Sequence, residues 1–214
     1  DIRKTLIKFD DVMNDQRQVI FNQRLKILKS PDISQILESF FEETTISLEN
    51  IKDIYQKSND EKQYLANVKN VTGNAISDKE LVVMASLNKK DFQKKLKETY
   101  NIKKEERLKL IGADENNNIE KKIFIQIIDF AWRSHLQYLE QLRQVIGLRS
   151  YGQKDPLSEF KKEAFDLFEG LLEKIKIDLI KFLLNLNIVI STDDKNTEKV
   201  NKTDIKNQNK KIQR

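Results

Sequence analysis

One short segment, 142–156 (LRQVIGLRSYGQKDP), limits the possible folds of this chain more than any other. It lies between two long segments whose apolar residues recur at helical spacing. Gly147 and Gly152 supply backbone freedom for a turn, and Asp155 followed by Pro156 has the form of an N-cap with proline at the first helical position. The pattern predicts two long helices joined by a short loop, which pack as an antiparallel hairpin.

Each flanking segment carries an apolar stripe that the other can bury. The first segment runs from about 119 to 148, and its stripe consists of Phe124, Ile128, Ala131, Leu139, Leu142 and Ile146. The second stripe consists of Leu157, Phe160, Ala164, Leu167, Leu171, Ile175, Leu179, Phe182 and Leu186. Thirty helical residues extend about 45 Å, so the loop would lie far from the base of the hairpin. A partner could then be contacted by the loop residues Arg149, Tyr151, Gln153 and Lys154.

The composition agrees with a mostly helical chain. Apolar residues make up 38% and charged residues 34%, and only five Gly and two Pro interrupt 214 residues. A strand-rich fold needs many turns, so we expect an all-α protein. The run 179–190 is too short and too polar to span a bilayer. The stretch 191–214 lacks aromatic residues, is rich in Asn and Lys, and is expected to be a disordered tail.

The charge and cysteine content exclude some classes of function. The net charge of +5 comes from 39 basic and 34 acidic residues, a balance typical of interleaved solvated faces. We therefore expect no nucleic-acid partner, and only the sequence pI of about 9.1 favours one. The absence of cysteine excludes disulfides and thiolate chemistry. Because the first residue is Asp and no signal-peptide pattern follows it, we expect these residues to come from a longer or processed protein.

Upstream of the hairpin, proline, glycine and helix-capping residues divide the chain into further predicted helices. An apolar stripe over 2–27 predicts a first helix, which should end at Ser30-Pro31 because proline disfavours a helical predecessor. A broad apolar face over 36–55 predicts a second helix. The pattern over 58–88 is weaker.

Within and after that weaker stretch, several short signals mark helix ends. Thr72-Gly73-Asn74 reads as a turn, and Ser77 with Glu80 has capping-box spacing for a short helix. Another helix is predicted from about Lys89 to a stop at Gly112. The polar run 114–118 (DENNN) is predicted to be a loop.

The residues of this chain do not form a recognisable catalytic set. No glycine stands in a phosphate-binding loop, and one histidine without cysteine cannot form a usual zinc site, so we expect no cofactor or metal here. His135 lies inside a predicted helix without a visible base partner, which favours a packed or hydrogen-bonded role. Asp10 and Asp11 point apart as helical neighbours and suit separate salt bridges or caps. On its own, the chain is therefore not expected to be an enzyme.

Three blocks of the sequence resemble the C-terminal half of the SecA family of ATP-driven preprotein translocases. Residues 1–20, DIRKTLIKFDDVMNDQRQVI, are similar to the family's DIRK…L…YDDV-N-QR-IY run, with Phe9 where tyrosine is common. Residues 128–136 match its ID–W–HL pattern, and 142–165 repeat its LRQ, LR-Y-QKDP and E(F/Y)K-E-F elements. The blocks occur in the family's order and cover about a third of the chain.

The resemblance implies an anatomy of four parts. These are the end of a long helical-scaffold helix (1–30), a small helical wing (31–118), the two-helix finger of the scaffold (119–190) and a linker or tail (191–214). The nucleotide-binding folds, which hold ATP and Mg in this family, and the preprotein-crosslinking domain would lie upstream. The cysteine-rich zinc tail of many members would follow the linker.

The resemblance also assigns roles to particular residues. Tyr151 stands at the fingertip position that contacts the translocating polypeptide, and Arg149, Gln153 and Lys154 would face the channel or the substrate. The matched motifs assign scaffold packing to Asp10, Asp11, Arg17, Trp132, His135 and Arg143.

The fingertip departs from the family pattern. Val145 and Gly147 replace the usual Gly and His, and Ser150-Tyr151-Gly152 replaces Gly-Tyr-Ala. The glycine has thus moved to the other side of the tyrosine, which changes how the loop can bend.

The function that the resemblance implies is coupling of ATPase motion to the pushing of unfolded preprotein through the SecY channel. The implied partners are the upstream ATPase domains, SecY and the preprotein, and the implied location is the cytoplasmic face of the bacterial plasma membrane, held peripherally through the channel. The residues also leave open a stand-alone helical adaptor that binds a protein partner without translocase activity.

Overall fold

The computed structural model describes residues 2–148 and 155–188, with side chains described from Ile7 onward. Over these ranges the protein contains helices and no strand, which confirms the predicted all-α class. The helices are α1 (Ile2–Lys29), α2 (Ser34–Ser58), α3 (Glu61–Thr72), α4 (Asp78–Ala85), α5 (Lys89–Ile111), α6 (Ala113–Ile146) and α7 (Pro156–Asn185). The predicted tail at 191–214 lies outside the described residues.

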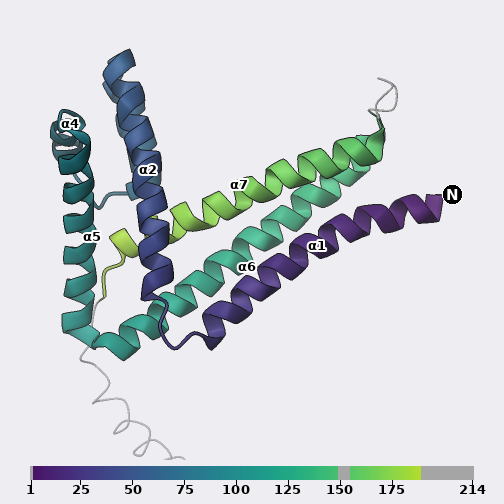
Figure 1. Ribbon diagram of the computed structural model, residues 1–214, viewed down its shortest axis with the longest axis horizontal. Coiled ribbons are helices and arrows are strands. Elements are labelled where there is room, and N and C mark those ends of the chain that lie inside the picture. The colour runs from purple at the N-terminus through teal and green to yellow at the C-terminus, as the bar shows by residue number, and fades with distance from the viewer. Residues whose placement is uncertain (1, 149–154, 189–214) are drawn as a thin grey trace, which may run out of the picture.

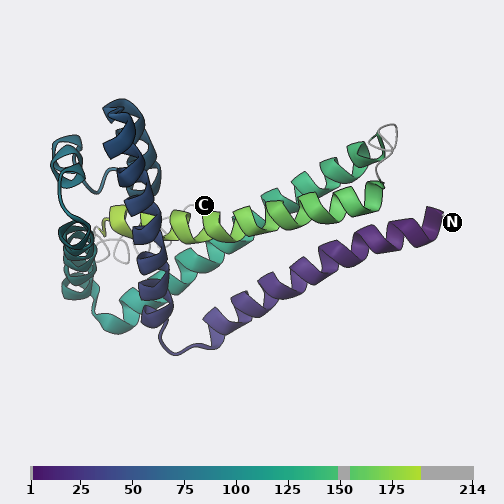
Figure 2. The same ribbon diagram turned by 45° about the horizontal axis from the view of Figure 1, so that its top comes forward.

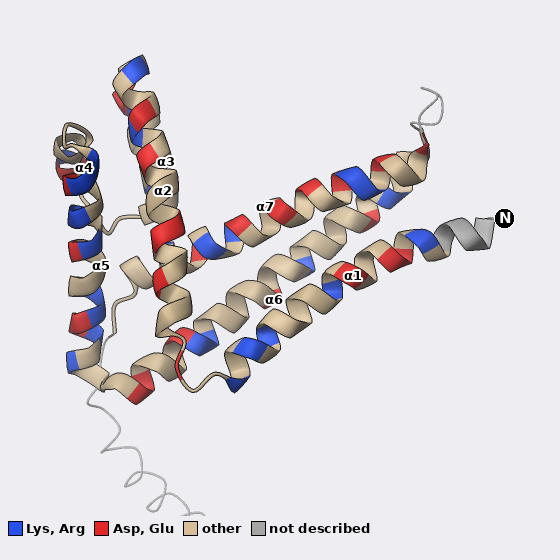
Figure 3. Ribbon diagram, in the orientation of Figure 1, with Lys and Arg blue, Asp and Glu red and all other residues tan. Residues whose placement is uncertain are grey.

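The helices form two parts, which Figures 1 and 2 show from two directions. Helices α1, α6 and α7 lie lengthwise beside one another, and we call them the three-helix bundle. Helices α2, α3 and α5 pack around the end of this bundle that holds the C-terminus of α7, and α4 packs against these three helices. We call α2 to α5 the lateral unit. Basic and acidic residues follow each other along α1, α5 and α7, as predicted for interleaved solvated faces (Figure 3).

Most helix ends follow the local signals that the sequence contains. Helix α1 ends at Lys29, two residues before Pro31. Ser77 and Glu80 form the predicted capping box of α4, and the Asn88 side chain caps α5 by accepting from the Asp91 backbone N–H. These interactions satisfy backbone donors that have no partner inside the helix.

The predicted polar loop at 114–118 is wrong, because α6 already begins at Ala113. Gly112, at φ 81°, makes the break between α5 and α6 without the need for a loop. Asp114 and Glu115 then occupy the first turn of α6, where negative charge is favourable. The sequence analysis also did not predict α3, which packs Tyr64, Val68 and Val71 inside the lateral unit.

The apolar side chains form three cores along the molecule. The core at the loop end of the bundle consists of Phe9, Leu139, Ile146, Phe160 and Ala164. The middle core joins α1, α6 and α7 to the start of α2 and includes Ile20, Phe124, Ile128, Leu179 and Leu183. The third core lies inside the lateral unit and includes Ile180 and Leu184 of α7. Helix α7 thus contributes to every core.

Candidate functional site

The predicted hairpin is present over the described residues, with α6 and α7 antiparallel and in close contact (Figure 1). Leu139, Phe160 and Ala164 are fully buried between them, and the Phe9 ring of α1 packs edge-on against Phe160, with ring centroids 4.8 Å apart. The hairpin is therefore braced by a third helix along its length.

The loop of the hairpin is framed by two well-defined ends. The Asp155 side chain accepts hydrogen bonds from the Ser158 hydroxyl (2.7 Å) and backbone N–H (2.9 Å), and the hydroxyl bond in particular lowers the pKa of Asp155. Gly147 has φ −59°, a conformation open to any residue, so the freedom expected of it is not used. The fingertip residues Arg149, Tyr151, Gln153 and Lys154 lie outside the described residues.

His135 lies at the centre of a polar contact that joins all three helices of the bundle. Its Nε2 is 2.8 Å from Oε1 of Gln16, whose Nε2 donates to the carbonyl oxygen of Ala164 at 2.9 Å. Because the Gln16 amide nitrogen is engaged with a carbonyl, Oε1 acts as the acceptor and His135 Nε2 as the donor. His135 is 4% exposed, and burial lowers its pKa, so the imidazole is neutral at pH 7.

Aromatic rings surround this contact. The Trp132 ring lies 5.5 Å from the His135 ring between centroids, and the Phe168 ring lies 5.8 Å away. Trp132 itself is half-buried and packs against the middle core. These positions agree with the packed, hydrogen-bonded role that the sequence favoured for His135, and they bring Trp132 into the same cluster.

Two ion pairs tie α1 to α6 on either side of His135. Arg24 Nη2 donates to Asp129 Oδ2 at 3.1 Å, and its Nε lies 2.9 Å from Oδ1 as an ionic contact without hydrogen-bond geometry. Arg143 Nη1 donates to Asp10 Oδ1 at 3.2 Å, while its Nη2 contacts Glu140 of the same helix. Both pairs are partly exposed, so each contributes about 0–1 kcal/mol.

The other predicted packing residues of α1 face outward. Asp11 and Arg17 are exposed, and neither makes a hydrogen bond or ion pair with the side chains that the structure describes, at 7–148 and 155–188. Their packing role stays a prediction about surfaces beyond this chain. Arg24, by contrast, was missed by the sequence analysis, because nothing local indicates that it faces Asp129.

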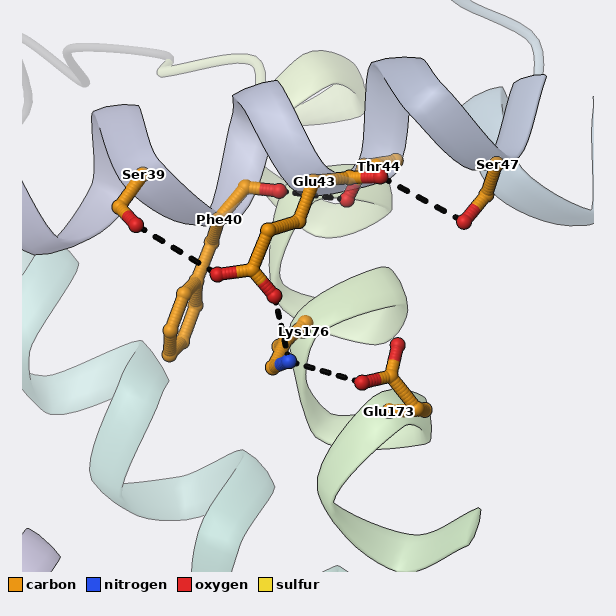
Figure 4. A network of polar contacts seen from close by, with 7 residues as sticks. All are labelled: Ser39, Phe40, Glu43, Thr44, Ser47, Glu173 and Lys176. Atoms are coloured by element: carbon orange, nitrogen blue, oxygen red, sulfur yellow. Dashed lines mark hydrogen bonds and ion pairs between the residues drawn. The ribbon is translucent and has the colours of Figure 1, made fainter. Parts of the chain in front are cut away.

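A second polar contact holds α2 against α7 (Figure 4). Lys176 Nζ lies between Glu173 of its own helix (2.8 Å) and Glu43 of α2, and 5.9 Å from the Phe40 ring centroid. Burial, the largest single influence, would lower the pKa of Lys176, but the bonds to both carboxylates together raise it. Lys176 also lines a cavity of about 420 Å³ with Ile20, Gln23, Phe40, Ile128, Glu169, Leu172, Glu173 and Ile175.

The sequence analysis also missed a buried ion pair between α5 and α6. Arg107 of α5 is 2% exposed and Glu120 of α6 is 1% exposed, and Arg107 Nη2 donates to Glu120 Oε1 at 3.1 Å. A signal existed: Arg107 continues the inward spacing of Leu96 and Tyr100 on α5. The pair was missed because Glu120 follows directly after the segment 114–118, which was predicted to be a loop.

The described residues do not bring together a metal-binding group of three or more His, Cys, Asp or Glu side chains. In the same part of the chain, no helix combines the length and apolar character that a membrane crossing requires. The described helices form the three-helix bundle, with the connection at residues 149–154 at one end and the lateral unit at the other.

Comparison with known proteins identifies relatives of this arrangement. Residues 1–187 match the family described as SecA Wing and Scaffold domain. The chain is 44% identical over 189 residues to the protein translocase subunit SecA of Pelagibacter ubique, covering 88% of this chain and 22% of that protein. It is 36% identical to the SecA of Hyphomonas neptunium over 198 residues, and 37% identical to SecA 1 of Magnetococcus marinus over 189 residues. These matches cover 88% and 86% of this chain and 21% of each relative, so the chain spans about a fifth of their length.

Proposed function

The chain belongs to the SecA Wing and Scaffold domain family, and from that premise we propose that it is the scaffold, wing and finger part of a preprotein translocase. The match over residues 1–187 carries the proposal. The three-helix bundle corresponds to the scaffold and its two-helix finger, and the lateral unit corresponds to the wing. The boundaries 1–30, 31–118, 119–190 and 191–214 stay predictions, and the boundary at 118/119 falls inside α6.

The mechanical part of the proposal rests on the bracing of the hairpin. A rod that transmits a push must resist bending, and the Phe9–Phe160 contact and the Gln16 bridge to His135 and Ala164 connect α1 to both hairpin helices. Movement applied to α1 would then displace α6 and α7 together and carry the loop at 149–154 with them. We infer that the chain acts as the arm that delivers movement, while ATP and Mg are bound and hydrolysis occurs in parts of the translocase outside these residues.

The loop of the arm is the proposed contact with the moving polypeptide. Tyr151 offers a flat apolar ring that can grip diverse side chains and a hydroxyl that can bond to the backbone. Arg149, Gln153 and Lys154 supply polar contacts to the SecY channel or the unfolded preprotein. In this proposal the protein works at the cytoplasmic face of the membrane and is held there through the channel.

The test replaces Tyr151 by alanine in the full-length translocase that contains this chain. We expect translocation of a preprotein to slow by roughly tenfold, the effect of losing about 1.4 kcal/mol of contact, while basal ATP hydrolysis is retained. Tyr138→Ala is the matched control, because Tyr138 is 62% exposed on the side of the same hairpin and away from its loop. Normal translocation by the Tyr151 variant would refute the fingertip role.

A further inference from the structure

The chain crosses twice between the three-helix bundle and the lateral unit, and both crossings meet the same short segment of α6. The first crossing is the connection 30–33 between α1 and α2. Asn117 donates from Nδ2 to the Pro31 carbonyl at 2.7 Å and accepts from the Ile33 backbone N–H at 3.3 Å. Lys121 donates to the carbonyl oxygens of Ser30 and Pro31. Residues 117 and 121 of α6 therefore hold this connection in place.

The second crossing is the break at Gly112 between α5 and α6, and Arg107 holds it. The guanidinium donates from Nε to Asn116 Oδ1 at 3.2 Å, from Nη2 to Glu120 Oε1 at 3.1 Å, and from Nη1 to the Leu183 carbonyl at 2.8 Å. Asn116 is 3% exposed, so every side chain of this network is buried. One side chain of α5 thus binds both the start of α6 and the end of α7.

The two sets of contacts are made from adjacent faces of α6. Asn116 and Glu120 are one turn apart, and so are Asn117 and Lys121, so the four residues form two neighbouring rows on α6. Leu183 lies in the last turn of α7, where backbone carbonyls lack helical partners and a cation is favoured. Arg107 therefore caps the C-terminus of α7 and also bonds α5 to α6.

Apolar packing constrains the orientation between the bundle and the lateral unit less strictly than directional polar contacts do. The middle core contains Leu179 and Leu183, and the lateral core contains Ile180 and Leu184, but burial of apolar surface is non-directional. A buried ion pair with further hydrogen bonds has few acceptable arrangements, because each unpaired polar group would be costly. The polar network can thus select one orientation among those that bury similar apolar area.

We propose that Arg107 is a positioning residue that locks the orientation of the lateral unit relative to the hairpin, so that the two move as one body. The lock consists of Arg107, Asn116, Glu120 and the Leu183 carbonyl. The lock lies within this chain, so the proposal does not depend on the proposed function in a translocase.

The experiment measures the distance between the two parts directly. The chain contains no cysteine, so Lys62→Cys in α3 and Arg133→Cys in α6, both at exposed positions, can carry a pair of spin labels. Arg107→Met with Glu120→Gln removes both buried charges together and avoids leaving one unpaired. We expect a wider or shifted distance distribution for this double variant, with helix content unchanged.

The matched control is Lys103→Met with Glu106→Gln, which removes an exposed ion pair of 3.3 Å from the same helix. Its distance distribution should equal that of the parent. If the buried double variant does not fold, Arg107→Lys keeps the charge but cannot reach three acceptors at once, and should widen the distribution by a smaller amount. A folded variant at Arg107 whose distribution matches the parent in centre and width would overturn the proposal.

Discussion

At the scale of single residues, buried polar side chains determine how the helices of the bundle meet. Gln16 and His135 are 119 positions apart in sequence, yet they form a 2.8 Å contact that also involves the Ala164 carbonyl. Buried polar groups must be paired, so this contact restricts the axial position of α1 on the hairpin more sharply than apolar packing does. The histidine is thus a structural group, and its burial favours the neutral form.

His135 should make the stability of the protein dependent on pH in a defined range. Burial lowers its folded pKa below the ordinary value of 6.5, so the unfolded chain binds the proton more readily. The stability that this difference contributes is present above pH 6.5 and is lost as the pH falls through the lowered folded pKa. Because His135 is the only histidine, one imidazole NMR signal reports its titration, and urea unfolding at pH 7.5 and 5.5 measures the loss of stability.

The control for this prediction is His135→Gln, which cannot titrate. Its stability should change much less between the two pH values, because the carboxylates with lowered pKa, such as Asp32 and Asp155, titrate at lower pH. A folded-state pKa for His135 at or above 6.5 would contradict the prediction.

At the scale of helices, capping and glycine positions decide where each helix begins and ends. Gly73 ends α3 at φ 64°, where an added Cβ would collide with the Asn185 side chain. That side chain donates to the Thr72 carbonyl at 2.8 Å and accepts from the Asn74 N–H at 2.9 Å. The close approach ties α3 to the last turn of α7, so this glycine is required. Gly170 lies within α7, and a Cβ there would meet no neighbour within 4 Å.

Substitution by alanine should therefore change the free energy of unfolding in opposite directions at the two glycines. Gly170→Ala should raise the free energy of unfolding by about 0.5–1 kcal/mol, because alanine loses less backbone entropy in a helix. Gly73→Ala should lower the free energy of unfolding by about 1 kcal/mol or more, because its φ is positive and its space is filled. Urea denaturation of each variant measures both effects, and a stabilised Gly73 variant would show that the close approach to Asn185 is not needed.

At the scale of the whole molecule, α7 connects parts that could otherwise unfold separately. Its residues Leu179 and Leu183 lie in the middle core, while Ile180 and Leu184 lie in the core of the lateral unit. Neither core is complete without the same helix. The protein is therefore expected to unfold as one cooperative unit over the described residues.

Two sets of aromatic residues can test that cooperativity. Trp132 is the only tryptophan and reports on the bundle, while Tyr55, Tyr64 and Tyr100 report on the lateral unit. In a background where the other two tyrosines are replaced by phenylalanine, both signals should change at the same urea concentration. Ile180→Ala should cost about 2–5 kcal/mol and shift both transitions equally. A tyrosine transition that shifts alone would mean that the lateral unit unfolds independently.

Much of this architecture could be predicted from local sequence patterns. The apolar spacing of α1, α2, α5, α6 and α7, the capping box at Ser77 and the Asp155-Pro156 start all depend on residues within a turn or two of each other. The family resemblance likewise rested on contiguous blocks and is confirmed by the match over residues 1–187. The four fingertip residues were also named from such a block, and their role stays a prediction.

The errors and omissions occurred where a residue's partner is distant in sequence. The segment 114–118 looked like a loop because its Asn residues usually favour turns, whereas here Asn116 bonds to Arg107 and Asn117 to Pro31. Arg107 and Glu120 likewise had no readable partner until α5, α6 and α7 met. Helix formation follows from short-range periodicity and caps, but the pairing of buried polar groups follows from which helices pack together. That packing is a property of the folded chain, because only it brings these groups out of water and within bonding distance.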